Sequence, residues 1–210
     1  MQKRMVVISG FSGAGKSTVI AKLESKSHLE LVKSHTTRPL RYEQEFYYSI
    51  PKTKFEELIK ETKFIEYNKY AGNYYGTSYE EINRVLNKNN IPILEIDTNG
   101  LLQLIEKTKD DDIEMQTIFI AIDGDTLYDR LRKRGTEDKE KVMRRLKTAL
   151  QEVEKLQMYQ YVFLNKDIDT TVKDILRAIN HESVMSHRFN IEEFSKRVSE
   201  IISKLEEKDQ

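Results

Sequence analysis

The chain of 210 residues contains no cysteine. Disulfides, thiolate zinc sites and thiol nucleophiles are therefore excluded. Lys plus Arg and Asp plus Glu number 35 each, so no overall charge of one sign attracts nucleic acid or an anionic membrane. The longest apolar runs are far shorter than the roughly 20 residues that cross a bilayer, and the basic N-terminus lacks the apolar region of a secretory signal. We expect a soluble cytoplasmic protein with no nucleic-acid or membrane partner.

A phosphate-binding pattern, G-x-x-x-x-G-K-S, runs from Gly10 to Ser17. It follows an apolar run at 4–9 and leads into a predicted helix, which is the strand–loop–helix context that this pattern requires. Its glycines allow a tight turn that exposes consecutive backbone N–H groups, and the following helix adds its positive N-terminal end. Lys16 would reach the β- and γ-phosphates of a nucleotide, and the Ser17 hydroxyl would bind Mg²⁺. A glycine-rich turn without a ligand has no reason to place Lys-Ser at a helix start.

Apolar runs alternate with helical patterns along much of the chain. The predicted strands are 5–9, 91–97, 116–122 and 161–165, and the predicted helices are 16–26, 98–108, 125–134 and 168–180. This alternation predicts an α/β fold with a parallel sheet covered on both faces. In such sheets the ligand binds at the carboxyl ends of the strands, where the Gly10–Ser17 loop lies.

Residues 32–90 interrupt the alternation and are rich in Tyr, Lys and Glu, so we interpret them as an inserted lobe. Capping-box patterns place helix starts near Thr53 and Ser78. Gly72 and Gly76 indicate a tight turn rather than a regular strand between them.

Two further helical segments leave alternatives open. Residues 125–157 are polar and helical with a break at Gly135, which suits either a mobile lid or a solvated helical hairpin. In the tail, 181–210, apolar residues recur at helical spacing, so an amphipathic helix could dock on the domain or form a dimer.

The lobe carries residues suited to a second nucleotide. Arg38 and Arg41, with nearby Ser and Tyr hydroxyls, could hold another phosphate through bidentate guanidinium contacts. A buried Glu66 carboxylate could accept hydrogen bonds from guanine N1–H and its exocyclic amine, while the Thr77 hydroxyl could donate to O6. Adenine reverses donor and acceptor on that edge, so this pair would favour guanine.

The order of these motifs resembles the guanylate kinase family over about residues 4–180. It comprises the phosphate loop, Ser34-His-Thr-Thr-Arg38, Phe64-Ile-Glu66, Gly72-Asn-Tyr-Tyr-Gly-Thr77, Ile93-Leu-Glu-Ile-Asp97 with Gly100, Arg130-Leu131, Arg134-Gly-Thr136, Arg145-Leu146 and Asn165. The resemblance implies a P-loop nucleoside monophosphate kinase fold, with a central parallel sheet flanked by helices. It divides the domain, 1–180, into a core (1–31, 91–124 and 158–180), a GMP-binding lobe (32–90) and a helical lid (125–157). The tail, 181–210, has no counterpart in the minimal enzyme.

The resemblance also assigns site residues. On the acceptor side, Ser34, Arg38, Arg41 and Tyr47 would hold the GMP phosphate with Tyr75 nearby, Glu66 and Thr77 would recognise guanine, and Glu95 or Asp97 would complete the nucleoside pocket. On the donor side, ATP would be bound by Gly10, Ser12, Gly13, Ala14, Gly15, Lys16, Ser17 and Thr18, with Arg130 and Asn165 beside adenine. The catalytic groups would be Lys16, Arg38, Arg134 and Arg145, and the metal ligand would be Ser17.

The implied reaction is ATP-dependent phosphorylation of GMP, and of dGMP, to GDP by direct in-line transfer with Mg²⁺. The acceptor phosphate has a second pKa of about 6, so it needs no general base at neutral pH. We expect a monomer or a homodimer whose small-molecule partners are ATP and GMP. The alternatives are a P-loop kinase for another phosphorylated acceptor (a modified nucleotide or ribose bisphosphate), a catalytically silent binding module, and a regulatory ATPase or GTPase.

Overall fold

The computed structural model describes residues 3–40, 46–70, 72–133, 139–184 and 189–207. The chain divides into two compact units. The first unit comprises Met1–Ile8 and Leu23–Gln116, and the second comprises Ser9–Lys22 and Thr117–Gln210. Among the described residues, no helix has both the length and the apolar character of a membrane span.

The larger sheet has the strand order β2-β7-β1-β8-β9. Its strands are β1 (Lys3–Gly10), β2 (Leu29–Leu31), β7 (Ile91–Glu95), β8 (Ile113–Ala121) and β9 (Tyr161–Leu164). Parallel pairing joins β2 to β7, β7 to β1, and β8 to β9. Four of them, β1, β7, β8 and β9, lie where the apolar runs predicted strands, and so confirm those predictions. The prediction missed β2, because three residues are too few to show a periodic pattern.

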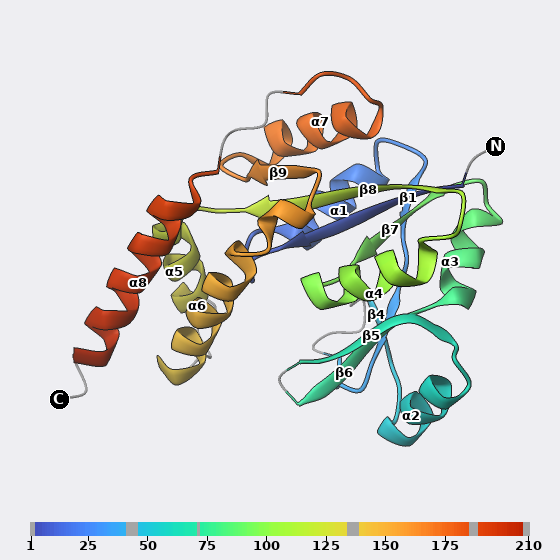
Figure 1. The fold of residues 1–210 in the computed structure, drawn as a ribbon, viewed down its shortest axis with the longest axis horizontal. Coiled ribbons are helices and arrows are strands. Elements are labelled where there is room, and N and C mark those ends of the chain that lie inside the picture. The colour runs from blue at the N-terminus through green and yellow to red at the C-terminus, as the bar shows by residue number, and fades with distance from the viewer. Residues whose placement is uncertain (1–2, 41–45, 71, 134–138, 185–188, 208–210) are drawn as a thin grey trace. The chain divides into compact units, whose positions relative to one another are not determined.

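The helices are labelled in Figure 1. They are α1 (Lys16–Glu24), α2 (Lys52–Lys60), α3 (Tyr79–Leu86), α4 (Thr98–Thr108), α5 (Gly124–Lys133), α6 (Lys139–Val153), α7 (Ile168–Ile179) and α8 (Ile191–Glu207), with a short 3-10 helix at Leu156–Met158. Side-chain caps start several of them. Asp97 accepts from Gly100 N at the start of α4, and Asp167 accepts from Thr170 N at the start of α7.

The first unit also contains a second, four-stranded sheet with the order β4-β3-β6-β5. Its strands are β3 (Ser34–Thr36), β4 (Tyr47–Ser49), β5 (Phe64–Tyr70) and β6 (Asn73–Ser78). The tight turn predicted for 72–77 is wrong, since β6 pairs antiparallel with both β5 and β3. Gly76 has a packing reason instead: a Cβ there would lie 3.0 Å from the Phe55 ring and 3.1 Å from the Phe64 ring. Only Gly72, with φ +84°, has a turn conformation.

Both helices predicted from capping-box patterns start within a residue or so of the expected positions, but only one of them has the expected side-chain cap. Ser78 caps α3 by accepting a hydrogen bond from Glu81 N at 3.3 Å, as the capping-box pattern predicted. By contrast, α2 begins at Lys52 with Pro51 as its N-cap and has no side-chain cap. Pro51 O accepts the first helical bond from Phe55 N, so Thr53 already lies inside the helix.

In the second unit, α5, α6 and α8 lie side by side (Figure 1). Leu127 and Leu131 of α5 are buried, as are Val142 and Leu146 of α6. The break predicted at Gly135 falls outside the described residues. The apolar positions predicted in the tail lie on α8, where Phe194, Val198, Ile201 and Ile202 are buried.

Candidate functional site

The phosphate loop lies in the second unit, between the end of β1 and the start of α1. Phe11 N donates to Ile120 O, and a Cβ at Gly10 would lie only 2.4 Å from that carbonyl oxygen. Gly13 and Gly15 have φ values of +87° and +90°, which disfavour a side chain. The loop therefore needs glycine at these positions, both for its left-handed turns and for its close approach to β8.

Lys16 and Ser17 occupy the first turn of α1. The Lys16 ammonium donates to Gly10 O at 2.9 Å and to Phe11 O at 3.4 Å, so it lies across the loop. Ser17 is exposed at the helix N-terminus. This places a cation, a hydroxyl and a helix N-terminus beside the same loop, which is the arrangement that binds phosphate.

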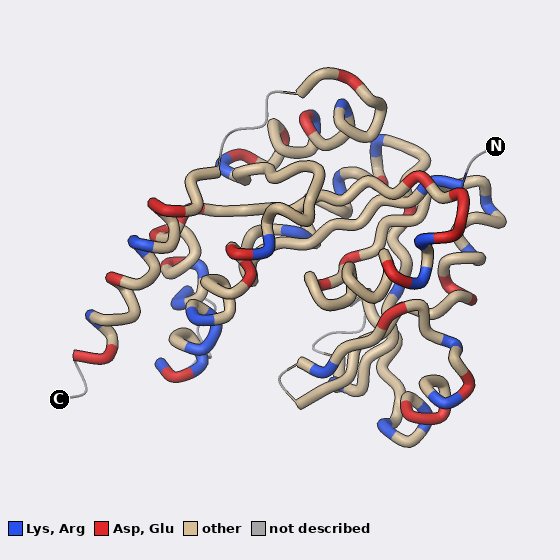
Figure 2. The backbone as a smooth tube through the Cα atoms, in the orientation of Figure 1, with Lys and Arg blue, Asp and Glu red and all other residues tan. Residues whose placement is uncertain are grey.

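Two arginines from neighbouring helices reach the same loop. Arg130 of α5 donates to Gly13 O, and Arg145 of α6 donates to Ser12 Oγ, each at 2.9 Å. Figure 2 shows that basic positions recur along these two helices. Positive charge thus gathers around the loop although the whole chain has no net charge.

Asn165 supports the loop from the end of β9 and is 3% exposed. Its side-chain amide donates to Ala14 O at 2.7 Å, and its Oδ1 accepts from the Thr171 hydroxyl at 3.1 Å. A Cβ at Gly15 would lie 2.9 Å from the same amide nitrogen. The structure thus brings Asn165 to the loop, and Thr171, which the sequence did not single out, orients it. The place of Asn165 beside adenine stays a prediction.

The first unit contains the predicted acceptor residues, and a β-bulge determines their orientation. Phe64 pairs with Ser78, whereas Glu66 pairs with Thr77, so Ile65 is an extra residue in β5. In a regular strand Phe64 and Glu66 would lie on the same face. The bulge reverses the alternation after Phe64.

The contacts of the two faces confirm this reversal. A Cβ at Gly76 would meet Phe64 and Tyr67, so these aromatic side chains share one face of the sheet. Glu66 points to the other face, where its Oε2 would lie 2.7 Å from a Cβ at Gly100 of α4. A methyl group at Gly100 would therefore displace the Glu66 carboxylate from its present position.

Glu66 is 4% exposed. Its pKa is raised to about 7: burial is the main cause and the nearby Asp97 charge adds to it, while hydrogen bonds from Thr77 and the charge of Lys107 oppose the shift. Thr77 is fully buried, and its hydroxyl lies 3.2 Å from Ser34 Oγ. A ligand that donates two further hydrogen bonds to the carboxylate would stabilise its charged form.

The residues predicted to hold the acceptor phosphate lie around β3, β4 and β6. The Arg38 guanidinium lies 5.8 Å from the Tyr47 ring centroid, and Nη1 donates to Pro39 O at 2.9 Å. Tyr47 packs edge-to-face on Tyr75, with 5.9 Å between ring centroids. Arg38, Tyr47 and Tyr75 are therefore neighbours. Arg41 lies outside the described residues, as does Arg134 of the predicted catalytic set.

Asp97 and Glu95, the two candidates for the nucleoside pocket, differ in their positions. Asp97 caps α4 through one oxygen and accepts from Asn68 Nδ2 through the other, at 2.8 and 2.5 Å. Its negative charge raises the Glu66 pKa, which places it beside the predicted base site. Glu95 is the last residue of β7 and is partly exposed.

Sequence reasoning missed Asn68 as the partner of Asp97. The close packing of Gly100 against Glu66 had a signal in the sequence, because a glycine inside a predicted helix is unusual and often has a packing reason.

The residues present fit a magnesium ion that arrives with a nucleotide. Mg²⁺ usually retains several waters and binds through substrate phosphates plus one or two protein oxygens. Ser17 supplies one hydroxyl oxygen beside the phosphate loop. In the described part of the chain, no three His, Cys, Asp or Glu side chains gather as a self-sufficient metal site.

Comparison with known proteins agrees with this arrangement. The family model described as guanylate kinase matches residues 2–182. The chain is 35% identical over 181 residues to the guanylate kinase of Prochlorococcus marinus subsp. pastoris, covering 84% of this chain and 97% of that protein. It is 38% identical over 184 residues to the guanylate kinase of Clostridium tetani, covering 85% and 86%. The crystal structure of guanylate kinase from Anaplasma phagocytophilum superposes with a TM-score of 0.67 at 26% identity, covering 88% of both chains. The α/β chain with its phosphate loop is therefore a nucleotide kinase and belongs to the guanylate kinase family.

Proposed function

We propose that the protein transfers the γ-phosphoryl group of ATP to GMP, and also to dGMP, and forms GDP or dGDP with ADP. The observation that carries the choice of acceptor is the buried Glu66 carboxylate opposite Thr77, against Gly100. Guanine presents two donors to a carboxylate and an acceptor to a hydroxyl, so it matches this pair. The contacts assigned here involve the base and the phosphate, and none involves a ribose 2′-hydroxyl, which is why dGMP is included.

On the donor side, the phosphate loop would bind the ATP phosphates through its N–H groups. Lys16 would exchange its bonds with the Gly10 and Phe11 carbonyls for bonds with the β- and γ-phosphates. Mg²⁺, held by the phosphates and Ser17, would neutralise charge on the transferring group. Arg130 and Arg145 already reach the loop and would add stabilising charge there.

On the acceptor side, Arg38 and Tyr47 would hold the GMP phosphate while Glu66 and Thr77 hold the base. The reacting phosphate oxygen is already ionised at neutral pH, so the protein has no proton to remove. Its contribution is to align acceptor and donor and to stabilise charge. We also propose Arg41 and Arg134 for these tasks on sequence grounds alone.

The rival functions make different demands on the same residues. A binding module without catalysis does not need Lys16, Ser17 and Arg38, all of which are retained. A kinase for another acceptor would not depend on Glu66 for its choice of substrate. These rivals can therefore be separated by two substitutions.

The test is coupled phosphotransfer with ATP–Mg²⁺ against GMP, dGMP, AMP, CMP and UMP. We expect strong preference for GMP and dGMP, a loss of about 100-fold or more in kcat in Lys16→Ala, and a loss of about 100-fold in kcat/KM for GMP in Glu66→Gln. Glu106→Gln, which alters an exposed glutamate of α4, is the matched control and should behave as wild type. Equal turnover of all five monophosphates would reject the assignment.

A further inference from the structure

Helix α8 lies beyond the residues matched by the family model, which end at 182, yet it packs beneath the phosphate loop. The link is Phe11, the second residue of the loop, whose side chain is fully buried. Its ring stacks on Phe194 of α8, with 4.7 Å between centroids and 3° between planes. Phe119 and Phe189 complete this aromatic cluster at 4.9 and 6.0 Å from Phe11.

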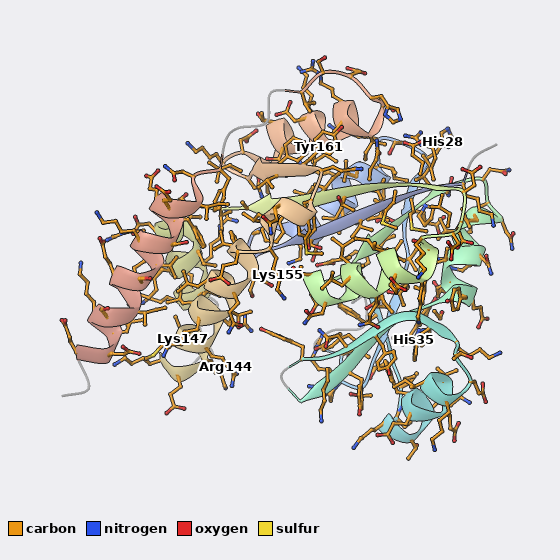
Figure 3. The ribbon with its side chains drawn as sticks, viewed as in Figure 1. His28, His35, Arg144, Lys147, Lys155 and Tyr161 are labelled. Carbon is orange, nitrogen blue, oxygen red and sulfur yellow. The ribbon has the colours of Figure 1, made fainter. Side chains whose placement is uncertain are left out.

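The same helix is bound to both helices that carry loop-binding arginines. Arg197 of α8 forms a bidentate pair with Asp125 in the first turn of α5, through Nε and Nη2 at 2.7–3.0 Å. A Cβ at Gly124 would lie 3.2 Å from Arg197 Cγ, so the two helices are in close contact there. Lys147 of α6, labelled in Figure 3, donates to Glu206 of α8 at 3.0 Å.

The backbone around Phe11 connects this packing to the loop that binds phosphate. Phe11 O accepts from Ala14 N at 3.0 Å and from Lys16 Nζ at 3.4 Å, and Phe11 N donates to Ile120 O. A shift of the Phe11 ring would therefore move the carbonyls and the N–H groups of the loop. A shift of α5 or α6 would likewise move Arg130 or Arg145, which bond to Gly13 and Ser12.

We propose that α8 is a positioning element of the ATP site, in which Phe194 fixes the phosphate loop and Arg197 fixes the helix that carries Arg130. The inference rests on the proposed function only in that the loop binds ATP. Both residues act indirectly in this proposal: Phe194 acts through Phe11, and Arg197 acts through Asp125. Loss of either contact should weaken ATP binding and leave GMP recognition, which depends on the first unit, unchanged.

The experiment measures ATP–Mg²⁺ binding by calorimetry without acceptor, together with KM for ATP and for GMP, in the full chain. We expect Phe194→Ala to raise Kd and KM for ATP about tenfold, because small displacements at a phosphoryl-transfer site are costly, with KM for GMP unchanged. Phe194→Leu, which keeps apolar bulk, should recover most of the affinity. Ile202→Ala is the control, because it removes a buried side chain two turns further along α8. Equal effects of Phe194→Ala and Ile202→Ala on ATP affinity would mean that α8 only supports the fold, and would overturn the proposal.

A second variant covers the case in which Phe194→Ala does not fold. Arg197→Ala removes a side chain that is 40% exposed, and we expect it to raise Kd for ATP about threefold with little loss of melting temperature. Arg177→Ala removes an arginine of α7 that is 42% exposed and paired with Glu182, and should leave ATP affinity unchanged. Wild-type affinity in Arg197→Ala would count against the proposal. A wild-type protein that binds ATP but does not phosphorylate GMP would reject the proposed function and leave the role of α8 testable.

Discussion

Replacing Glu66 by glutamine should make the protein more stable at high pH while it destroys the proposed base site. The reason is the Glu66 pKa of about 7, compared with an ordinary value of 4.5. Between these two pH values the folded protein holds a proton that the unfolded chain has released. The free energy of unfolding of the wild type therefore falls as pH rises through this window and levels off above pH 7. Glutamine cannot ionise, so the variant lacks this loss.

The magnitude follows from the same two pKa values. A shift of one unit corresponds to about 1.36 kcal/mol, so the wild type carries a penalty of about 1 kcal/mol at pH 5 and about 3 kcal/mol at pH 8 relative to a neutral side chain. The stability advantage of Glu66→Gln over the wild type should thus grow by about 2 to 3 kcal/mol from pH 5 to pH 8. Glu66 is almost fully buried, so solvent screening does not reduce this value appreciably.

Urea unfolding followed by circular dichroism at pH 5, 6, 7 and 8 measures this difference. The control is Glu106→Gln, whose glutamate has a side chain that is 73% exposed, and its stability curve should parallel that of the wild type. If the Glu66→Gln curve also runs parallel to the wild type across this range, Glu66 has an ordinary pKa and the reasoning from burial fails.

Three further predictions concern the two nucleotide sites. Lowering the pH from 8 to 6 should raise KM for GMP about tenfold in the wild type, because Glu66 becomes protonated. In Glu66→Gln, steady-state kinetics should show only a roughly twofold rise in KM, which comes from protonation of the GMP phosphate itself. Gly100→Ala places a methyl group 2.7 Å from Glu66 Oε2 and should raise KM for GMP about tenfold with KM for ATP unchanged; equal changes in both would indicate a general loss of folding. Asn165→Ala leaves Ala14 O without its buried donor and should weaken ATP binding about tenfold by calorimetry, whereas Lys166→Ala, at the exposed neighbour, should not.

Some wrong predictions have a common physical cause. The pattern Gly72–Thr77 was interpreted as a turn because glycine often marks turns, but Gly76 is needed where the Phe55 and Phe64 rings pack on β6. The short strands β2 and β3 have only three residues each, and their existence depends on partners far away in sequence. Non-local pairing thus overrode local propensity at these positions.

The sequence by itself determined the phosphate loop, because that site is built from consecutive residues whose backbone geometry depends on local glycines and a following helix. It also determined the strand–helix alternation and the residue types of the acceptor site, since those are carried by composition and spacing. Only the tertiary structure decided that a bulge at Ile65 turns Glu66 toward Gly100, and that burial there raises its pKa. Only the structure placed Phe194 against Phe11, and so gave the tail helix a place in the ATP site. Burial, side-chain direction and pKa depend on contacts between residues that are distant in sequence, and no local pattern specifies those contacts.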